Sequence, residues 1–109
     1  MPIRRCLTPE EQTAPLSRPV TPQQEELAKL AWALAHPSRV RIFSILRQHS
    51  ACLCGDLVGR MPLSQSTIFE HLKTLREAGL VQADSDGARV CYSVNEQTLE
   101  RLKTLVAEL

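Results

Sequence analysis

Apolar residues recur in several segments of this chain at i, i+3, i+4 and i+7, the spacing of a helix with one buried face. The pattern predicts helices over about residues 22–34, 37–48, 52–60, 65–78 and 96–109. Thr21, Ser64 and Asn95 are suited to N-cap the helices that follow them, because their side-chain oxygens accept a backbone hydrogen bond. Met61-Pro62 ends the short third helix, since proline cannot continue it.

Two short runs near the end of the chain have the composition of β-strands, Leu80–Ala83 and Arg89–Val94. Residues 84–88 between them contain Asp86-Gly87, a turn signal, so a hairpin is predicted. The order α-α-α-α-β-β-α indicates a mainly α (α+β) fold, the winged helix-turn-helix, with the hairpin as its wing.

The first and last predicted helices carry apolar positions that one small domain does not cover. Trp32 falls off the stripe of the first helix, and the stripe of the last helix continues to Leu109. We therefore expect a homodimer formed through these two helices. Residues 1–20 hold four prolines and no apolar period, which predicts a flexible arm carrying Cys6. Residues 21–109 are expected to form the DNA-binding and dimerisation domain.

Composition and charge exclude several classes of protein. A chain of 109 residues has room for one domain, and 13 basic against 12 acidic residues exclude a polycation that coats nucleic acid by charge alone. The longest apolar-leaning stretch, Leu27–Ala35, is well short of the roughly 20 residues that span a bilayer, and no secretory signal pattern is present. We expect a cytoplasmic protein with no membrane partner. Its four cysteines are therefore interpreted as metal ligands or redox groups before a disulfide framework.

A short helix, a turn and a helix with a polar start form a motif that inserts side chains into the major groove of DNA. Gln can bond an adenine edge, Ser and Thr can bond bases or phosphates, and long cations reach the backbone. The alternative for the polar residues is an ordinary solvated first turn, and for Arg89, at the wing tip, a solvated arginine. Phe69 either touches a thymine methyl group or packs on a neighbouring side chain or on the partner subunit. The DNA-binding candidates are Ser64, Gln65, Ser66, Thr67, Phe69, Lys73 and Arg89.

Cys52-Leu53-Cys54 places two thiolates at the predicted start of the third helix, where they grip one ion only if the helix is frayed or bent. A soft ion needs a third ligand. Cys6 is our choice, because the arm is long enough to reach the pair in its own or the partner subunit. Cys91 in the wing strand is the alternative, although a packed side chain is its simpler interpretation. Three sulfurs without histidine favour trivalent arsenic or antimony over zinc, and binding is predicted to deform the segment that positions the DNA reader.

The chain closely resembles the ArsR/SmtB family of metal-sensing transcriptional repressors over about residues 24–95. The resemblance rests on the segments AHPSRVRI, CLCGDLV, LSQSTI and HLK, at residues 35–42, 52–58, 63–68 and 71–73. It implies a homodimeric winged helix that binds an operator near its own promoter and is released when a metalloid binds Cys52 and Cys54. Residues 64–67 match the start of the family's recognition helix. Leu57 stands where the arsenic branch often has a further cysteine, and residues 95–109 lack the Asp and His ligands of zinc and nickel sensors.

The sequence thus predicts a dimeric repressor of double-stranded operator DNA, with trivalent arsenic or antimony as the inducer and no organic cofactor. One alternative keeps the fold and makes the cysteines a redox switch or a site for another thiophilic metal, such as cadmium or lead. Another is a thiol protein that does not bind DNA. An enzyme is not expected, because the chain has no Gly-rich phosphate loop and its three histidines show no nucleophile–base motif.

Overall fold

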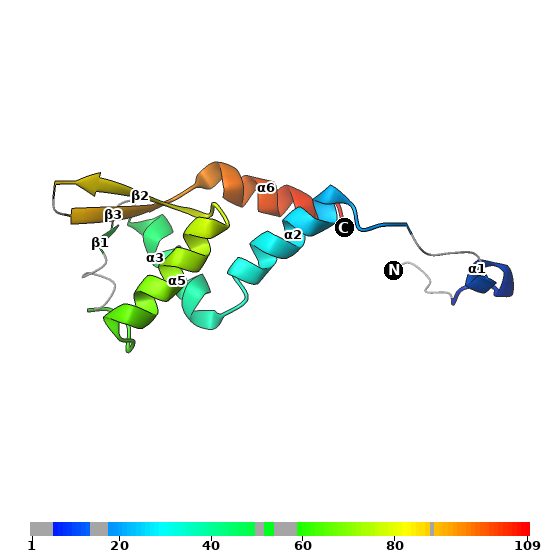
Figure 1. Cartoon of the computed structure of the whole chain (residues 1–109), viewed down its shortest axis with the longest axis horizontal. Coiled ribbons are helices and arrows are strands. Elements are labelled where there is room, and N and C mark those ends of the chain that lie inside the picture. Colours follow the sequence, from blue (N-terminus) through cyan, green and yellow to red (C-terminus); the bar gives the residue numbers. More distant parts are fainter. Residues whose placement is uncertain (1–5, 14–17, 50–51, 54–58, 88) are drawn as a thin grey trace.

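The computed structural model describes residues 6–13, 18–49, 52–53, 59–87 and 89–109 (Figure 1). The described helices are α1 (Pro9–Thr13), α2 (Pro22–Ala33), α3 (Pro37–Gln48), α5 (Gln65–Glu77) and α6 (Glu96–Ala107). The described strands are β1 (Cys52–Leu53), β2 (Val81–Asp86) and β3 (Arg89–Val94). In this part of the chain no helix is both long enough and apolar enough to cross a bilayer.

The predicted caps start three of the helices. Thr21 accepts a hydrogen bond from the backbone N–H of Gln24, and the side chain of Gln24 accepts one from the N–H of Thr21, a capping box that begins α2. Ser64 accepts from the N–H of Thr67 at the start of α5, and Asn95 accepts from two N–H groups at the start of α6. Each bond satisfies a donor that the first turn of a helix leaves unpaired. The N-caps predicted from the sequence are confirmed for α2, α5 and α6.

One hydrophobic core joins α2, α3, α5, the hairpin and α6. Fully buried large side chains dominate it: Ile42, Leu46, Ile68, Leu72, Leu75 and Leu80. Burying each of these contributes about 1.5–3 kcal/mol relative to leaving it exposed. Because one face of α5 holds three of these residues, the core fixes which side of that helix faces solvent.

The strands form one antiparallel sheet in the order β1-β3-β2. β2 and β3 pair from Val81↔Val94 to Asp86↔Arg89. The predicted first strand was therefore too short, because pairing continues to Asp86 and the connection begins at Gly87, with φ of 64°. Gly79 has φ of 81° in the turn between α5 and β2, a backbone conformation that glycine adopts without steric cost.

The predicted helix over residues 52–60 is wrong at its start. Cys52 and Leu53 form β1, paired with Tyr92 and Cys91 of β3. The edge of β3 offers backbone donors and acceptors that local periodicity does not reveal, and pairing with them overrides helical propensity. Residues 54–58, which include Cys54 and the middle of this predicted helix, lie outside the described residues. The observed order of strands and helices is nevertheless a winged helix-turn-helix, as predicted.

The predicted arm contains regular structure. Residues 9–13 form the five-residue helix α1, which Figure 1 shows apart from the helices of the domain. Thr8 begins it by accepting a hydrogen bond from the N–H of Glu11. This local cap explains a helix where no apolar period is present.

Candidate nucleic-acid interface and thiol site

The start of α5 presents a cluster of hydroxyl groups to solvent. Oγ of Ser64 lies 3.2 Å from Oγ of Ser66 and 2.9 Å from Oγ1 of Thr67, in addition to capping the helix. Gln65 and Ser66 are exposed, whereas Thr67 is half-buried. The hydroxyl groups of Ser66 and Thr67 are both hydrogen-bonded to Ser64. The exposed Gln65 is therefore the member of this group whose side chain is most free to bond a base edge.

A second set of predicted residues continues along the same helix. Ser66, Phe69 and Lys73 are spaced i, i+3 and i+7 and are all exposed, on the side away from the buried residues of α5. Phe69 is 42% exposed. Glu70 is exposed beside it. The structure therefore brings together six of the predicted DNA-binding residues, Ser64 to Thr67, Phe69 and Lys73, on one helix.

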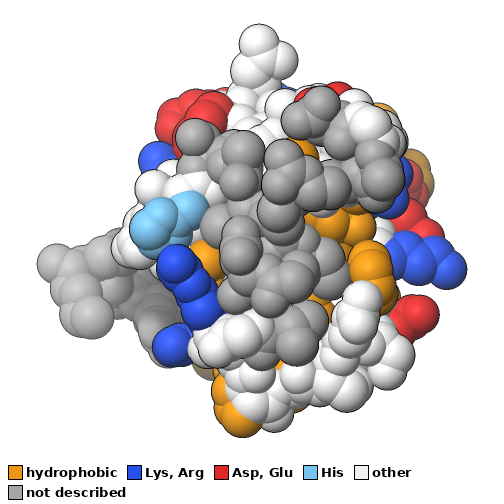
Figure 2. All heavy atoms as spheres, turned by 90° about the vertical axis from the view of Figure 1, so that its left-hand side faces the viewer, with side chains coloured by type: hydrophobic (Ala, Val, Ile, Leu, Met, Phe, Trp, Pro, Cys, Tyr) orange, Lys and Arg blue, Asp and Glu red, His pale blue; other side chains and the backbone are white. Residues whose placement is uncertain are grey.

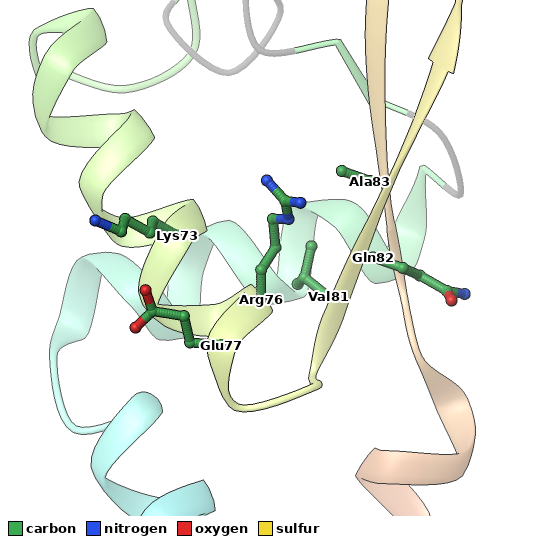
Figure 3. A pocket seen from close by; sticks show the side chains of 6 residues that line it. All are labelled: Lys73, Arg76, Glu77, Val81, Gln82 and Ala83. Atoms are coloured by element: carbon green, nitrogen blue, oxygen red, sulfur yellow. The ribbon is translucent and has the colours of Figure 1, made fainter.

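A cleft of about 550 Å³ lies between the second half of α5 and β2 (Figure 3). The residues lining it are Lys73, Arg76, Glu77, Val81, Gln82 and Ala83. Arg76 extends into the space between α5 and the strand, whereas Lys73 and Glu77 project from the helix away from β2. No hydrogen bond or ion pair joins Lys73 or Arg76 to another described side chain. Sequence reasoning missed Arg76, although its i+3 spacing from Lys73 was a usable signal.

Charges on the wing are mixed. Arg89 is the first residue of β3 and pairs in register with Asp86 at the far end of the hairpin, as the prediction of a wing-tip arginine requires. Asp84 is exposed on β2. Figure 2 looks onto the end of the molecule that holds the hairpin, and its described Lys and Arg side chains are scattered among acidic and apolar ones. Electrostatic attraction for a phosphate backbone is therefore modest for one chain.

Two histidines connect the start of α3 with α5. Nδ1 of His36 accepts a hydrogen bond from the N–H of Ser38 and caps α3. The ring of His36 lies 4.7 Å from that of His71, centroid to centroid. Partial burial lowers the pKa of His71, and the nearby His36 and Arg39 lower this pKa further. A neutral His71 is therefore favoured at neutral pH.

Among the described residues, the predicted sulfur ligands Cys6 and Cys52 lie on separate segments of the chain. Cys6 is exposed and Cys91 is half-buried, and both are free thiols. Figure 1 places the segment that carries Cys6 and strand β1 at opposite ends of the molecule. Cys52 occupies the β1 position paired with Tyr92, and Cys54 lies outside the described residues. Across the described ranges no three His, Cys, Asp or Glu residues are grouped so as to hold a metal ion.

The predicted dimer face is open to solvent. Trp32 is 64% exposed, and Val106 of α6 and Leu109, which follows α6, are also exposed. Arg39 supports the tryptophan from one side: its guanidinium carbon lies 5.3 Å from the ring centroid, and its Nε donates to the carbonyl of Ala33 at 2.7 Å. The indole is thus held in place by a cation–π contact while most of its surface remains uncovered. Pairing with a second copy stays a prediction.

Comparison with known proteins identifies relatives of this arrangement. The family described as "Bacterial regulatory protein, arsR family" matches residues 36–83. A "Transcriptional repressor SmtB homolog" from Synechocystis sp. is 35% identical over 79% of this chain, which spans 64% of that protein's length. The "Arsenical resistance operon repressor" of Staphylococcus xylosus is 32% identical over 70% of this chain and 72% of its own. An "ArsR-like Transcriptional Regulator from Rhodococcus sp. RHA1" superposes with a TM-score of 0.71, at 26% identity, over 77% of this chain and 78% of that one.

Proposed function

Since the chain belongs to the arsR family of bacterial regulatory proteins, we propose that it is a dimeric transcriptional repressor that leaves its operator when a thiophilic metalloid binds. The observation that carries the DNA-binding part is the exposed start of α5, with Gln65, Ser66 and Lys73 on the solvent side of a helix whose other side is held in the core. Such a helix presents its polar side chains to the major groove without rearrangement.

The chemistry of this face divides into base reading and phosphate anchoring. Gln65 is suited to an adenine edge, and Ser66 to a base or a phosphate oxygen. Lys73 lies two turns further along α5, where a long cation reaches the sugar-phosphate backbone. Arg89 at the end of the wing is assigned to the flanking minor groove or backbone. A dimer makes twice as many contacts to DNA bases and phosphates as a single, nearly neutral chain.

For the inducer we propose trivalent arsenic or antimony, held by the thiolates of Cys52, Cys54 and Cys6. Cys52 lies in the strand β1, so the helical spacing that keeps residues i and i+2 on different faces does not apply at this residue. The half-buried Cys91 is paired with Leu53 and is not assigned to the ion. Because the segments with Cys6 and β1 lie at opposite ends of one chain, we assign the third thiolate to the arm of the partner subunit.

The pairing of β1 with β3 supplies a route from the ion to the DNA reader. An ion bound at Cys52 pulls on the backbone that pairs with Tyr92 of the wing strand. Shifting a two-state protein from 1:99 to 99:1 takes a differential binding free energy of about 5.5 kcal/mol. Structural thiolate–zinc sites reach about 10–16 kcal/mol, so the bond energy of such a site is sufficient. We expect the ion to displace the wing, and with it the recognition helix.

The test is DNA affinity measured with and without arsenite by fluorescence anisotropy, on the duplex upstream of the chain's own gene. Wild type is expected to bind and to release on arsenite. Cys52→Ser and Cys54→Ser should bind the duplex as tightly as wild type and should not release it on arsenite. Cys91→Ser, the matched control, should respond like wild type.

Release by peroxide but not by arsenite would replace the metalloid site with a disulfide switch. Release by cadmium or lead alone would replace the ion. If wild type binds no duplex, the alternative of a thiol protein that does not bind DNA would replace the proposed function.

A further inference from the structure

Phe69 is an exposed aromatic ring in the middle of a polar surface. It is 42% exposed on the second turn of α5. Among the described side chains it belongs neither to the hydrophobic core nor to the layer packed against it. A phenyl ring in water lacks the stabilisation that burial brings, and the packing of the described residues does not account for its position.

The neighbours of Phe69 indicate what covers it. Ser66 lies one turn before the ring and Lys73 one turn after it, and both are exposed. The patch is therefore one apolar ring among hydroxyl and ammonium groups, too small and too polar for a helix or sheet of a protein partner. The major groove of DNA matches this pattern, since its base edges carry polar groups and one apolar group, the 5-methyl of thymine.

The charge that follows Phe69 in sequence favours bases over the backbone as the surface that the ring meets. Glu70 is exposed, and no described side chain neutralises its carboxylate. A carboxylate is repelled by phosphates, whereas it accepts hydrogen bonds from the amino group of cytosine in the major groove. Lys73, which phosphates attract, follows about one turn later. The order of groups along α5 thus runs from polar base contacts, through the ring and the carboxylate, to a backbone cation.

We propose that Phe69 contacts the 5-methyl group of a thymine and makes this protein select thymine at one position of each half-site. This inference rests on the proposed function, because it needs α5 in a major groove. It does not need a metalloid. It adds a readout of sequence to a helix whose other contacts are hydrogen bonds and charge.

The experiment removes the methyl group and nothing else. The wild-type full-length chain first enriches a binding duplex from a randomised pool. Each thymine of that duplex is then replaced, one at a time, by deoxyuridine, which keeps every hydrogen-bonding group. Affinities are measured by fluorescence anisotropy at one fixed salt concentration for wild type, Phe69→Ala and Val40→Ala. Val40 is the matched control, since it is an exposed apolar residue on α3.

At one thymine of each half-site, deoxyuridine is expected to weaken wild-type binding about fourfold, the effect of no longer burying one methyl group. Phe69→Ala should bind the two duplexes equally, and Val40→Ala should keep the fourfold difference. Wild-type affinity that is unchanged by deoxyuridine at every thymine would overturn the inference and leave the proposed function standing. A Phe69→Ala chain that still binds the thymine duplex more tightly than the deoxyuridine duplex would also overturn the inference and leave the proposed function standing. Failure of the wild-type chain to enrich any duplex would instead remove the proposed function, and this inference with it.

Discussion

The ring of His71 lies 4.7 Å from the ring of His36, which caps α3 through its Nδ1. The pKa of His71 is lowered from the ordinary value of 6.5, first by burial and then by His36 and Arg39. The unfolded chain therefore binds more protons than the folded one near this pH. Stability is expected to be full above about pH 6.5 and to fall as the pH drops through the lowered pKa of the folded state.

This pH dependence is measured as the free energy of unfolding in urea between about pH 7.5 and about pH 5.5. His71→Gln should reduce the fall in the free energy of unfolding at low pH, because the side chain whose protonation the folded state disfavours is gone. His49 is exposed at the C-cap of α3, so His49→Gln is the control and should keep the wild-type slope. A decline of equal steepness in His71→Gln would show that other groups cause it.

Trp32 is predicted to carry the dimer. Its ring is 64% exposed in the single chain, so Trp32→Ala should leave the fold intact while weakening self-association by about tenfold or more, as for central tryptophans of interfaces. Sedimentation over a range of concentrations measures this change. Val40→Ala, on another exposed surface, should leave the association constant as it is. Equal association of the Trp32→Ala and wild-type chains would contradict a dimer through α2 and α6.

Lys73 and Arg76 should contribute to the salt dependence of DNA binding. Both line the cleft between α5 and β2 without an ion-pair partner among the described side chains. Each substitution by Gln is expected to lower the slope of log affinity against log salt by about 0.9 for every phosphate that the variant no longer neutralises. Lys29→Gln is the control, because Lys29 is exposed on α2. An unchanged slope in both variants would place the phosphates away from this cleft.

The position of α5 depends on its buried face. Leu72 is 1% exposed, and Leu72→Ala should destabilise the chain by about 2–5 kcal/mol. A domain of this size has about 5–15 kcal/mol in total, so DNA affinity should fall together with the folded fraction. Unfolding in urea, followed by circular dichroism, gives the value. Val40→Ala should change stability by less than about 0.5 kcal/mol, and a comparable decrease there would point to an unrecognised contact of Val40.

Much of the fold follows from local rules. Thr21, Ser64 and Asn95 cap their helices with bonds to residues two or three positions away, and the apolar period of α5 selects its buried face. Such interactions depend on close neighbours in the chain, so the sequence alone determined α2, α3, α5 and α6, the hairpin and the solvent-facing side of α5. The close spacing of Cys52 and Cys54 likewise singles out the thiol pair as a candidate site without any long-range information.

The rest depended on partners that are distant in sequence. Cys52 and Leu53 become a strand because β3 has an edge to pair with, and no local period encodes that edge. The contact of His36 with His71 and the cleft that holds Arg76 arise only when α5 packs beside α3 and β2. Long-range pairing and burial outweigh local propensities of a few tenths of a kcal/mol per residue. For that reason most elements could be derived from the sequence, while the strand pairing of Cys52 and the surroundings of α5 required the folded chain.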